Sequence, residues 1–202
     1  MHISLDLGRM IQMKNKIGII LGSNRPNRIG GDVANWVKKA MEHADLEIDI
    51  IDLAEVNLPF LDEPTIPAMG NYQNEHTKAW SEEIQQYDGF VLLFPQYNWG
   101  YPAVIKNALD YLYTEWSHKP VSIMVYGGHG GFQGLISMKL VTQGLNMYNM
   151  SVNPPLTITK EMFDENNQFI DIDRSFETIK PQVAMVSEEF VQLFSVKKGG
   201  AS

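Results

Sequence analysis

The sequence predicts an α/β fold in which a doubly wound, five-stranded parallel sheet carries helices on both faces. Short apolar runs rich in β-branched residues alternate along the chain with stretches whose apolar residues recur at helical spacing. The run 89–94 contains no polar side chain, as expected of a strand covered on both faces. Because crossovers between parallel strands are right-handed, such an alternation distributes helices over both faces of one sheet.

The predicted elements follow one another regularly. The first run, 16–21, is apolar and ends in a turn sequence, and apolar residues at i, i+3, i+4 and i+7 from Val33 indicate a helix after it. The full prediction is strand 16–21, helix 29–43, strand 47–53, helix 74–86, strand 89–94, helix 101–116, strand 121–126, helix 132–148, strand 150–158 and helix 174–194. Pro154 and Pro155 interrupt the last of these strands.

One compact domain accounts for the whole chain. With 202 residues and 44% hydrophobic content, the chain is large enough for one sizeable core, and no low-complexity stretch suggests a second. We expect residues 1–15 to be a disordered extension, with Met10 or Met13 as alternative starts. The domain is then expected at 16–196, followed by a tail at 197–202.

Composition argues against several classes of protein. The net charge of −8 disfavours a sequence-independent nucleic-acid binder, which needs a basic face. The longest apolar runs are far shorter than the ~20 residues of a membrane span, so no membrane partner is expected. Without cysteine there is no disulfide, thiolate metal site or cysteine nucleophile, and a cytoplasmic setting fits. The five histidines show no metal-ligand spacing, and no GxSxG motif is present.

The loop 22–28 (GSNRPNR) has the chemistry of an anion site. It leads into a helix N-terminus and offers backbone amides, the hydroxyl of Ser23 and the guanidinium groups of Arg25 and Arg28. It is not a Walker A loop, and GxGxxG is absent. Two arginines match a terminal phosphate better than a pyrophosphate, which favours a mononucleotide. The alternative is an ordinary turn with two solvated arginines.

Two further loops follow predicted strands and should meet the first at one edge of the sheet. The loop 95–102 (PQYNWGYP) carries three aromatic and two carboxamide side chains, which suit the faces and polar edge of a flavin. The loop 126–131 (YGGHGG) has four glycines, which allow backbone amides to approach a ligand and stabilise negative charge on a reduced flavin. The alternatives are aromatics that only pack before a helix, a flexible turn, and a solvated His129.

These three segments resemble the phosphate, flavin-ring and glycine loops of the NADPH-dependent FMN reductase family, especially its fungal-type quinone and azo-dye reductase branch. The similarity spans about 16–150, with the middle motif extending as PQYNWGYPAVIKNALDYLY. It implies a flavodoxin-like fold, FMN as cofactor, NADPH or NADH as co-substrate, and ping-pong hydride transfer to quinones, free flavin or azo dyes. The implied FMN contacts are Ser23, Arg25 and Arg28 at the phosphate, Pro95, Gln96, Tyr97, Asn98 and Trp99 at the ring edge, and Tyr126, Gly127, Gly128 and Gly131 at the pyrimidine end. No catalytic side chain is implied, because the flavin N5 accepts the hydride.

Two other functions remain open at this stage. A flavodoxin-type carrier would bind FMN but pass single electrons between proteins, and the two arginines argue mildly against it. A nicotinamide-dependent reductase of Rossmann type is disfavoured by the missing glycine fingerprint. The acidic insert 161–173 is not part of the family pattern.

The remaining expectations concern single residues and assembly. Asp52 is expected to cap local backbone, and Asp62 and Glu63 to point apart into solvent rather than to form an acid/base pair. On the helix 101–116, Val104, Tyr111 and Tyr113 lie off the core-facing stripe and are expected to be partly exposed. Together with the resemblance, they predict a homodimer or homotetramer whose interface helps to wall the flavin slot.

Overall fold

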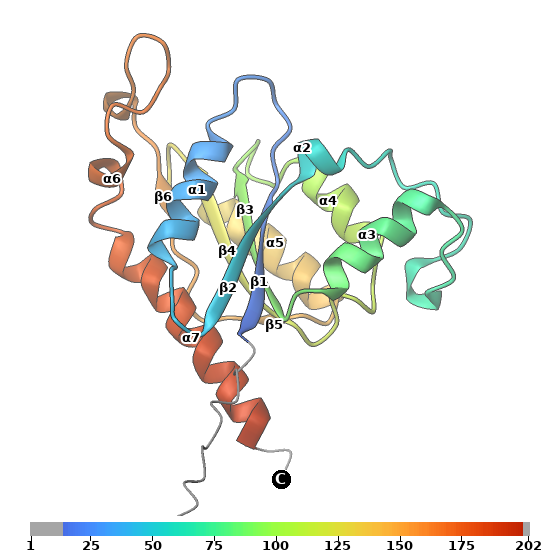
Figure 1. The fold of residues 1–202 in the computed structure, drawn as a ribbon. Helices are drawn as coiled ribbons and strands as arrows, with labels where there is room; N and C mark the ends of the chain where they lie inside the picture. Colours follow the sequence, from blue (N-terminus) through green and yellow to red (C-terminus); the bar gives the residue numbers. More distant parts are fainter. Residues whose placement is uncertain (1–13, 200–202) are drawn as a thin grey trace, which may run out of the picture.

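A parallel sheet forms the centre of the structure, a computed structural model that describes residues 14–199 (Figure 1). The strand order is β2-β1-β3-β4-β5, and β6 pairs with β4 beside that path. The strands are β1 (Asn15–Leu21), β2 (Leu46–Asp52), β3 (Gly89–Pro95), β4 (Pro120–Gly127), β5 (Tyr148–Asn149) and β6 (Leu156–Thr157). Every pairing between these strands is parallel. The predicted flavodoxin-like α/β fold is confirmed.

Helices cover both faces of the sheet, as predicted (Figure 1). Successive residues of β1 point to opposite faces, so that Ile19 packs with Val37 of α1 and Ile20 packs with Ile105 of α4. The helices α1 (Gly30–Ala40) and α7 (Lys180–Gly199) lie on one face, and α3 (Glu75–Gln85), α4 (Ala103–Asp110) and α5 (Phe132–Gly144) lie on the other. The short helices are α2 (Leu53–Val56), η1 (Pro67–Met69), η2 (Lys160–Met162) and α6 (Ile172–Ser175).

The expected strand 150–158 differs most from its prediction. Within this range only the two-residue strand β6 forms, and the two-residue strand β5 comes before it. β5 pairs with the start of β4 and β6 with its end. Between them, Pro154 and Pro155 have no amide hydrogen to donate to a strand ladder. A side chain bridges part of the gap, because Asn153 Oδ1 accepts the backbone N–H of Ile123 at 2.8 Å.

Two helices are shorter or more divided than predicted. The helix expected at 101–116 begins after Pro102 and ends at Asp110. The helix expected at 174–194 is split into α6 and α7. Between them Phe176 turns inward and packs on Trp36, with 4.8 Å between ring centroids, and α7 then starts with Pro181 in its first turn, where a missing amide hydrogen costs little.

The prediction that Tyr111 is partly exposed was wrong. Its side chain is fully buried. Its hydroxyl lies within hydrogen-bond distance of two acceptors, the carbonyl oxygen of Pro59 and Asp62 Oδ1, at 3.1 Å from each. The reason is that the irregular segment 57–74 folds back over α4, which periodicity along the helix does not reveal. Val104 and Tyr113 are partly buried and pack against the same core.

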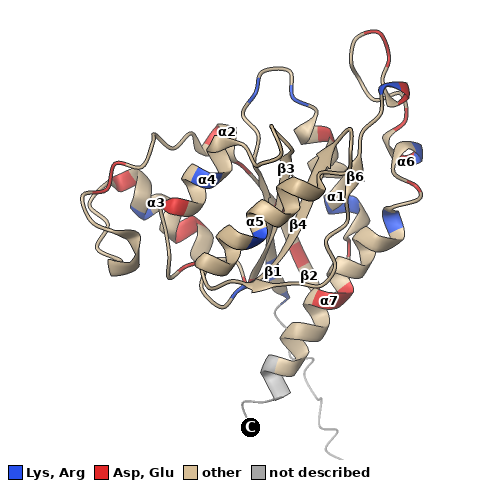
Figure 2. Cartoon of the chain, turned by 180° about the vertical axis from the view of Figure 1, so that it is seen from behind, with Lys and Arg blue, Asp and Glu red and all other residues tan. Residues whose placement is uncertain are grey.

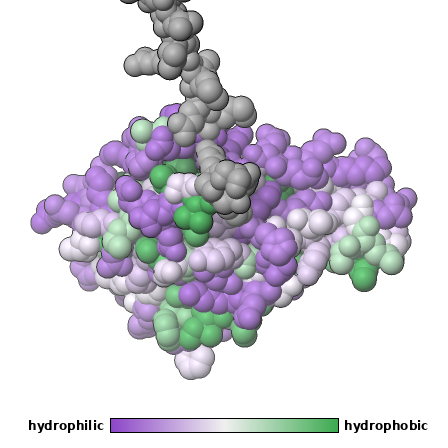
Figure 3. All heavy atoms as spheres, turned by 90° about the horizontal axis from the view of Figure 1, so that it is seen from below, coloured by the Kyte–Doolittle hydropathy of each residue, from purple (hydrophilic) through white to green (hydrophobic). Residues whose placement is uncertain are grey.

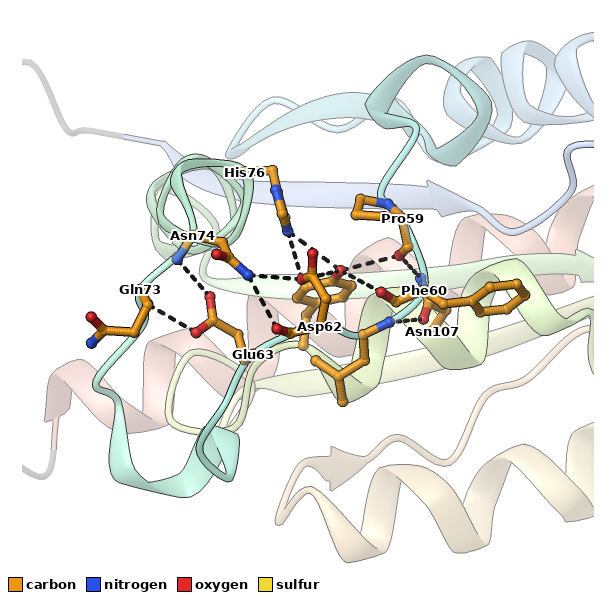
Figure 4. Close-up of polar contacts among 10 residues, drawn as sticks. Pro59, Phe60, Asp62, Glu63, Gln73, Asn74, His76 and Asn107 are labelled. Atoms are coloured by element: carbon orange, nitrogen blue, oxygen red, sulfur yellow. Dashed lines mark hydrogen bonds and ion pairs between the residues drawn. The ribbon is translucent and has the colours of Figure 1, made fainter.

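Asp62 and Glu63 point apart, but the expectation that they only face solvent was incomplete (Figure 4). Glu63 accepts the backbone N–H groups of Gln73 and Asn74 at 2.8 and 3.0 Å. Asp62 Oδ1 lies 2.9 Å from His76 Nε2, and this contact is the main cause that holds the pKa of Asp62 below its usual value. Asp62 therefore fastens the segment 57–74 to α3, and Glu63 closes the segment on itself just before that helix.

The amino ends of the strands lie at the opposite end of the molecule from the loops that follow β1, β3 and β4. Seen from the amino ends of the strands, the surface is mostly hydrophilic, with hydrophobic residues in a few separate patches (Figure 3). Among residues 14–199, no helix is long and apolar enough to cross a membrane.

The two predicted terminal segments fall largely beyond what the structure describes. Met10 and Met13 lie outside the described residues, as does the expected extension apart from Lys14 and Asn15. Asn15 already belongs to β1, and α7 runs beyond the predicted domain end at 196.

Candidate functional site

The three loops singled out in the sequence lie next to one another at the carboxyl edge of the sheet, because β1, β3 and β4 are neighbouring strands. The first residue after β1 donates to β3, with Gly22 N–H 2.8 Å from the carbonyl oxygen of Leu93. The first residue after β3 donates to β4, with the N–H of Gln96 3.1 Å from the carbonyl oxygen of Tyr126. We call 22–28 the phosphate loop, 95–102 the ring loop and 126–131 the glycine loop.

Ser23 supplies a buried hydroxyl that is not fully satisfied by the protein, although the Tyr126 hydroxyl lies near it. Its side chain is buried, and its hydroxyl forms no hydrogen bond of normal geometry with another described residue. Buried hydroxyls are normally paired, so a vacant one suggests a ligand atom. The N-terminus of α1 begins at Gly30, directly after the loop, and its free amides and dipole favour an anion at this place. These features fit a phosphate group.

The two arginines of the phosphate loop differ in their surroundings. Arg28 forms a bidentate ion pair with Asp52, with Nη1 2.7 Å from Oδ1 and Nη2 in contact with Oδ2, and it also donates to the carbonyl oxygen of Ser23. Arg25 is exposed and makes no hydrogen bond or ion pair with another described residue. Blue segments on the loop before α1 mark this basic stretch in Figure 2. Arg25 is therefore the guanidinium that is free to meet an anion.

The Arg28–Asp52 pair is a feature that the sequence reasoning missed. Asp52 also accepts the N–H of Ala54 at 3.0 Å as the N-cap of α2, which confirms its predicted capping role. The signal was present in the topology, because Asp52 lies opposite Leu21 in the β1–β2 register and so stands beside the start of the phosphate loop.

The ring loop forms a tight, strained turn. Tyr97 and Gly100 exchange backbone hydrogen bonds of 3.0 and 2.8 Å, and the two residues between them, Asn98 and Trp99, have φ of 47° and 67°. Positive φ in a non-glycine residue costs about 1–3 kcal/mol, and such strain is concentrated at functional sites. The turn holds the Trp99 side chain 73% exposed beside the end of β3.

Gln96 and Pro95 are less available to a ligand than the turn itself. Pro95 is buried at the end of β3, and Gln96 Oε1 accepts the N–H of Gly134 at 2.8 Å. That hydrogen bond ties the ring loop to the first turn of α5. Gln96 keeps its amide nitrogen for other partners.

The glycine loop contains backbone positions that favour glycine over any other residue. Gly130 and Gly131 have φ of 69° and 68°, and a Cβ on Gly131 would stand 2.2 Å from Val125 Cγ1. Tyr126 is buried, which raises the pKa of its hydroxyl to about 12, and this hydroxyl lies against Gly30 beneath the phosphate loop. Gly128 and His129 are exposed. The loop thus presents backbone to solvent and uses Tyr126 as a support.

A family model described as NADPH-dependent FMN reductase matches residues 15–156, which include all three loops. The chain belongs to this family. An NAD(P)H-dependent FMN reductase of Schizosaccharomyces pombe is 38% identical over 189 residues, which cover 92% of this chain and 94% of that protein. One of Saccharomyces cerevisiae is 35% identical over 196 residues, with 89% and 95% covered.

More distant bacterial relatives are named after the reduction of particular acceptors. A 2-hydroxy-1,4-benzoquinone reductase of Burkholderia is 28% identical over 59% of this chain and 58% of that protein. An FMN-dependent NADPH-azoreductase of Staphylococcus saprophyticus is 28% identical over 63% of this chain and 69% of that protein. The solved structure of the NAD(P)H:acceptor oxidoreductase FerB from Paracoccus denitrificans has a TM-score of 0.69 at 18% identity and covers 88% of this chain and 98% of its own, which supports the fold.

Family membership settles the reaction class. The protein is an oxidoreductase of a family that uses FMN with NAD(P)H as co-substrate, as the resemblance implied. The single-electron carrier is not favoured. Among the described residues, no three histidine, aspartate or glutamate side chains gather as a metal site would require.

Proposed function

We propose that the three loops hold FMN and that the enzyme reduces quinones, azo dyes or free flavin at its ring. The observation that carries this proposal is the buried hydroxyl of Ser23 near the N-terminus of α1, which forms no hydrogen bond of normal geometry with a described residue. In this arrangement Ser23, Arg25 and the loop amides bind the phosphate. Arg28 braces the loop through Asp52 and approaches the phosphate with the donors that the ion pair leaves free.

The other two loops receive the flavin ring. The residues from Pro95 to Trp99 border one edge, and the backbone of Gly127, Gly128 and Gly131 meets the pyrimidine end. Bound FMN supplies the ring nitrogen that takes a hydride from NAD(P)H. The chain contributes no acid or base: it orients the ring, and the amides of the glycine loop favour negative charge on its pyrimidine side.

The acceptor is a small, flat, conjugated molecule. The names of the Burkholderia and Staphylococcus relatives support quinone and azo substrates. The exposed rings of Tyr97 and Trp99 beside the slot favour flat acceptors. Because NAD(P)H and the acceptor use the same flavin face in turn, we expect parallel double-reciprocal lines. Intersecting lines, or a ternary complex, would contradict this part of the proposal.

Cofactor binding is the direct experiment. The protein should bind one FMN per chain in calorimetry and refuse FAD, because the phosphate loop closes on a terminal phosphate. Failure to bind FMN would overturn the assignment of the three loops.

We also propose a homodimer, but through α5 rather than through Tyr111. Every fourth residue of α5, starting at its first, is apolar and exposed, which makes a stripe along the helix. The exposed fractions of Phe132, Ile136 and Leu140 are 62%, 49% and 69%. The stripe begins beside the ring loop, since Gly134 contacts Gln96. A partner seated there would wall the flavin slot. Light scattering should give at least twice the 22.9 kDa chain mass, and Leu140→Glu should lower it. A monomeric wild type with full activity would refute the interface.

We propose a cytoplasmic location, because NAD(P)H is regenerated inside cells and the chain has no cysteine for an oxidising compartment to pair. Cell fractionation tests this directly.

A further inference from the structure

A cavity lies beside the phosphate loop, on the side that faces residues 163–168. Its volume is about 830 Å³. Its walls are the phosphate loop with the first turn of α1, the residue Ile158 after β6, and residues 163 and 166–168. The last group belongs to the segment 162–170, which we call the insert hairpin and which lies outside the region that the family model matches. In Figure 1 this segment rises beside the phosphate loop at the top of the molecule.

The insert hairpin is a fixed structure. Asp164 Oδ1 accepts the backbone N–H groups of Asn166 and Gln168, both at 2.9 Å, and the N–H of Ile170 donates to the carbonyl oxygen of Met162 at 2.9 Å. Asn166 and Gln168 contribute only their backbone N–H groups to these hydrogen bonds. Their side chains are therefore left exposed at the cavity.

A row of aromatic rings fastens the hairpin to the core. Phe163 and Phe169 lie 4.6 Å apart between centroids, Phe169 and Phe176 lie 5.9 Å apart, and Phe176 packs on the buried Trp36 of α1. The cavity wall therefore keeps its position relative to α1 and the phosphate loop.

The lining combines the groups that recognise an adenine nucleotide. Phe163 and Ile158 offer apolar surface for a base, and the carboxamides of Asn166 and Gln168 match the donor and acceptor edge of adenine. Asp32 can accept from ribose hydroxyls. Arg25 borders the cavity from the phosphate loop, and its five N–H donors allow it to meet a diphosphate here as well as the FMN phosphate. We propose that this cavity binds the adenosine diphosphate half of NAD(P)H, an inference that rests on the proposed function.

The cavity and the flavin slot share a wall. The N–H of Ile158 donates to the carbonyl oxygen of Gly127 at 3.0 Å, so the cavity ends where the glycine loop begins. A dinucleotide held by its adenosine half can pass this residue and reach the ring.

The test compares two reductants on FMN-saturated protein: NADPH, and reduced nicotinamide mononucleotide, which lacks the adenosine half. The variant is Asn166→Asp with Gln168→Glu, which preserves side-chain size, removes the two amide donors proposed to face the base and adds negative charge to the cavity. The KM for NADPH and the calorimetric Kd for 5′-ADP should each rise about tenfold. The kcat, the Kd for FMN and the KM for the mononucleotide should not change. Gln192→Glu, the same change on exposed α7, should leave every value at its wild-type level.

The inference is overturned if 5′-ADP does not bind the FMN-saturated wild type, or if the variant alters both reductants by the same factor. A wild type whose bound flavin neither reductant reduces would instead contradict the proposed function itself.

Discussion

Ser23 and the two arginines show how three side chains of one short loop divide their work. The hydroxyl of Ser23 forms no hydrogen bond of normal geometry with a described residue. The side chain of Arg25 is exposed to solvent, whereas the charge of Arg28 is neutralised by Asp52. Residue types and loop position predicted all three as phosphate contacts. The loop sequence could not separate the arginines, because the partner of Arg28 comes from β2, 24 positions away.

Replacing Ser23 with alanine removes a hydroxyl that forms no hydrogen bond of normal geometry with a described residue. The variant should keep the wild-type free energy of unfolding, while FMN binding weakens by about 1.5–3 kcal/mol through loss of a hydrogen bond to a charged phosphate. Calorimetry and thermal unfolding of the apoprotein measure the two effects. Thr77→Val provides a control away from the loops, because Thr77 is the other buried hydroxyl that forms no hydrogen bond of normal geometry among the described residues and lies on α3. Equal FMN affinity in all three proteins would remove Ser23 from the site.

The two arginines should respond differently to alanine. Arg25→Ala should weaken FMN binding by about 1.5–3 kcal/mol without changing stability. Arg28→Ala leaves the carboxylate of Asp52 unpaired and should also lower the free energy of unfolding by about 1–3 kcal/mol. A double-mutant cycle of Arg28→Ala with Asp52→Ala isolates the pair. A cycle with no coupling energy would mean that the ion pair does not stabilise the loop.

At the scale of elements, the sequence predicted the positions of strands and helices better than it predicted the irregular segments that pack over them. The apolar run of β3 and the periodicity of α1 were sufficient, because local pattern determines both. The prediction that Tyr111 is exposed failed because its cover, the segment 57–74, is irregular and is held by side chains such as Asn107 and Asp62 (Figure 4). Such contacts join residues about 50 positions apart and leave no periodic signal.

The segment 57–74 should loosen in acid. The pKa of Asp62 is lowered in the folded protein, chiefly by His76, so the stability that this carboxylate provides is complete above its ordinary value of 3.8 and is lost as pH falls through the lower folded pKa. The difference in free energy of unfolding between wild type and Asp62→Asn should therefore be constant near neutral pH and shrink below pH 3.8. A difference that is independent of pH would show that ionised Asp62 does not hold the segment.

The glycine loop should tolerate a side chain at one glycine but not at another. Gly131→Ala places a Cβ against Val125 at a φ of 68° and should destabilise the fold by about 1–3 kcal/mol or more. Gly128→Ala meets nothing closer than 3.9 Å and should unfold like the wild type. Thermal unfolding of both variants decides this. Equal stability would mean that the loop adopts another conformation.

At the scale of the whole molecule, the parallel sheet brings together three loops that are spread over residues 22–131 of the chain. The βα alternation predicted their convergence, because neighbouring parallel strands end at one edge. The sequence did not predict the insert hairpin or its cavity, since these depend on a row of rings between residues 36 and 176. The account therefore depends most on the claim that this edge holds a flavin that exchanges electron pairs.

The visible spectrum of the FMN-loaded protein under anaerobic conditions tests that claim most directly. Stoichiometric NADPH should bleach the flavin band in one two-electron step, and a quinone added afterwards should restore it fully. A protein that takes up no FMN, or whose bound flavin stays oxidised with excess NADPH and NADH, would contradict the account.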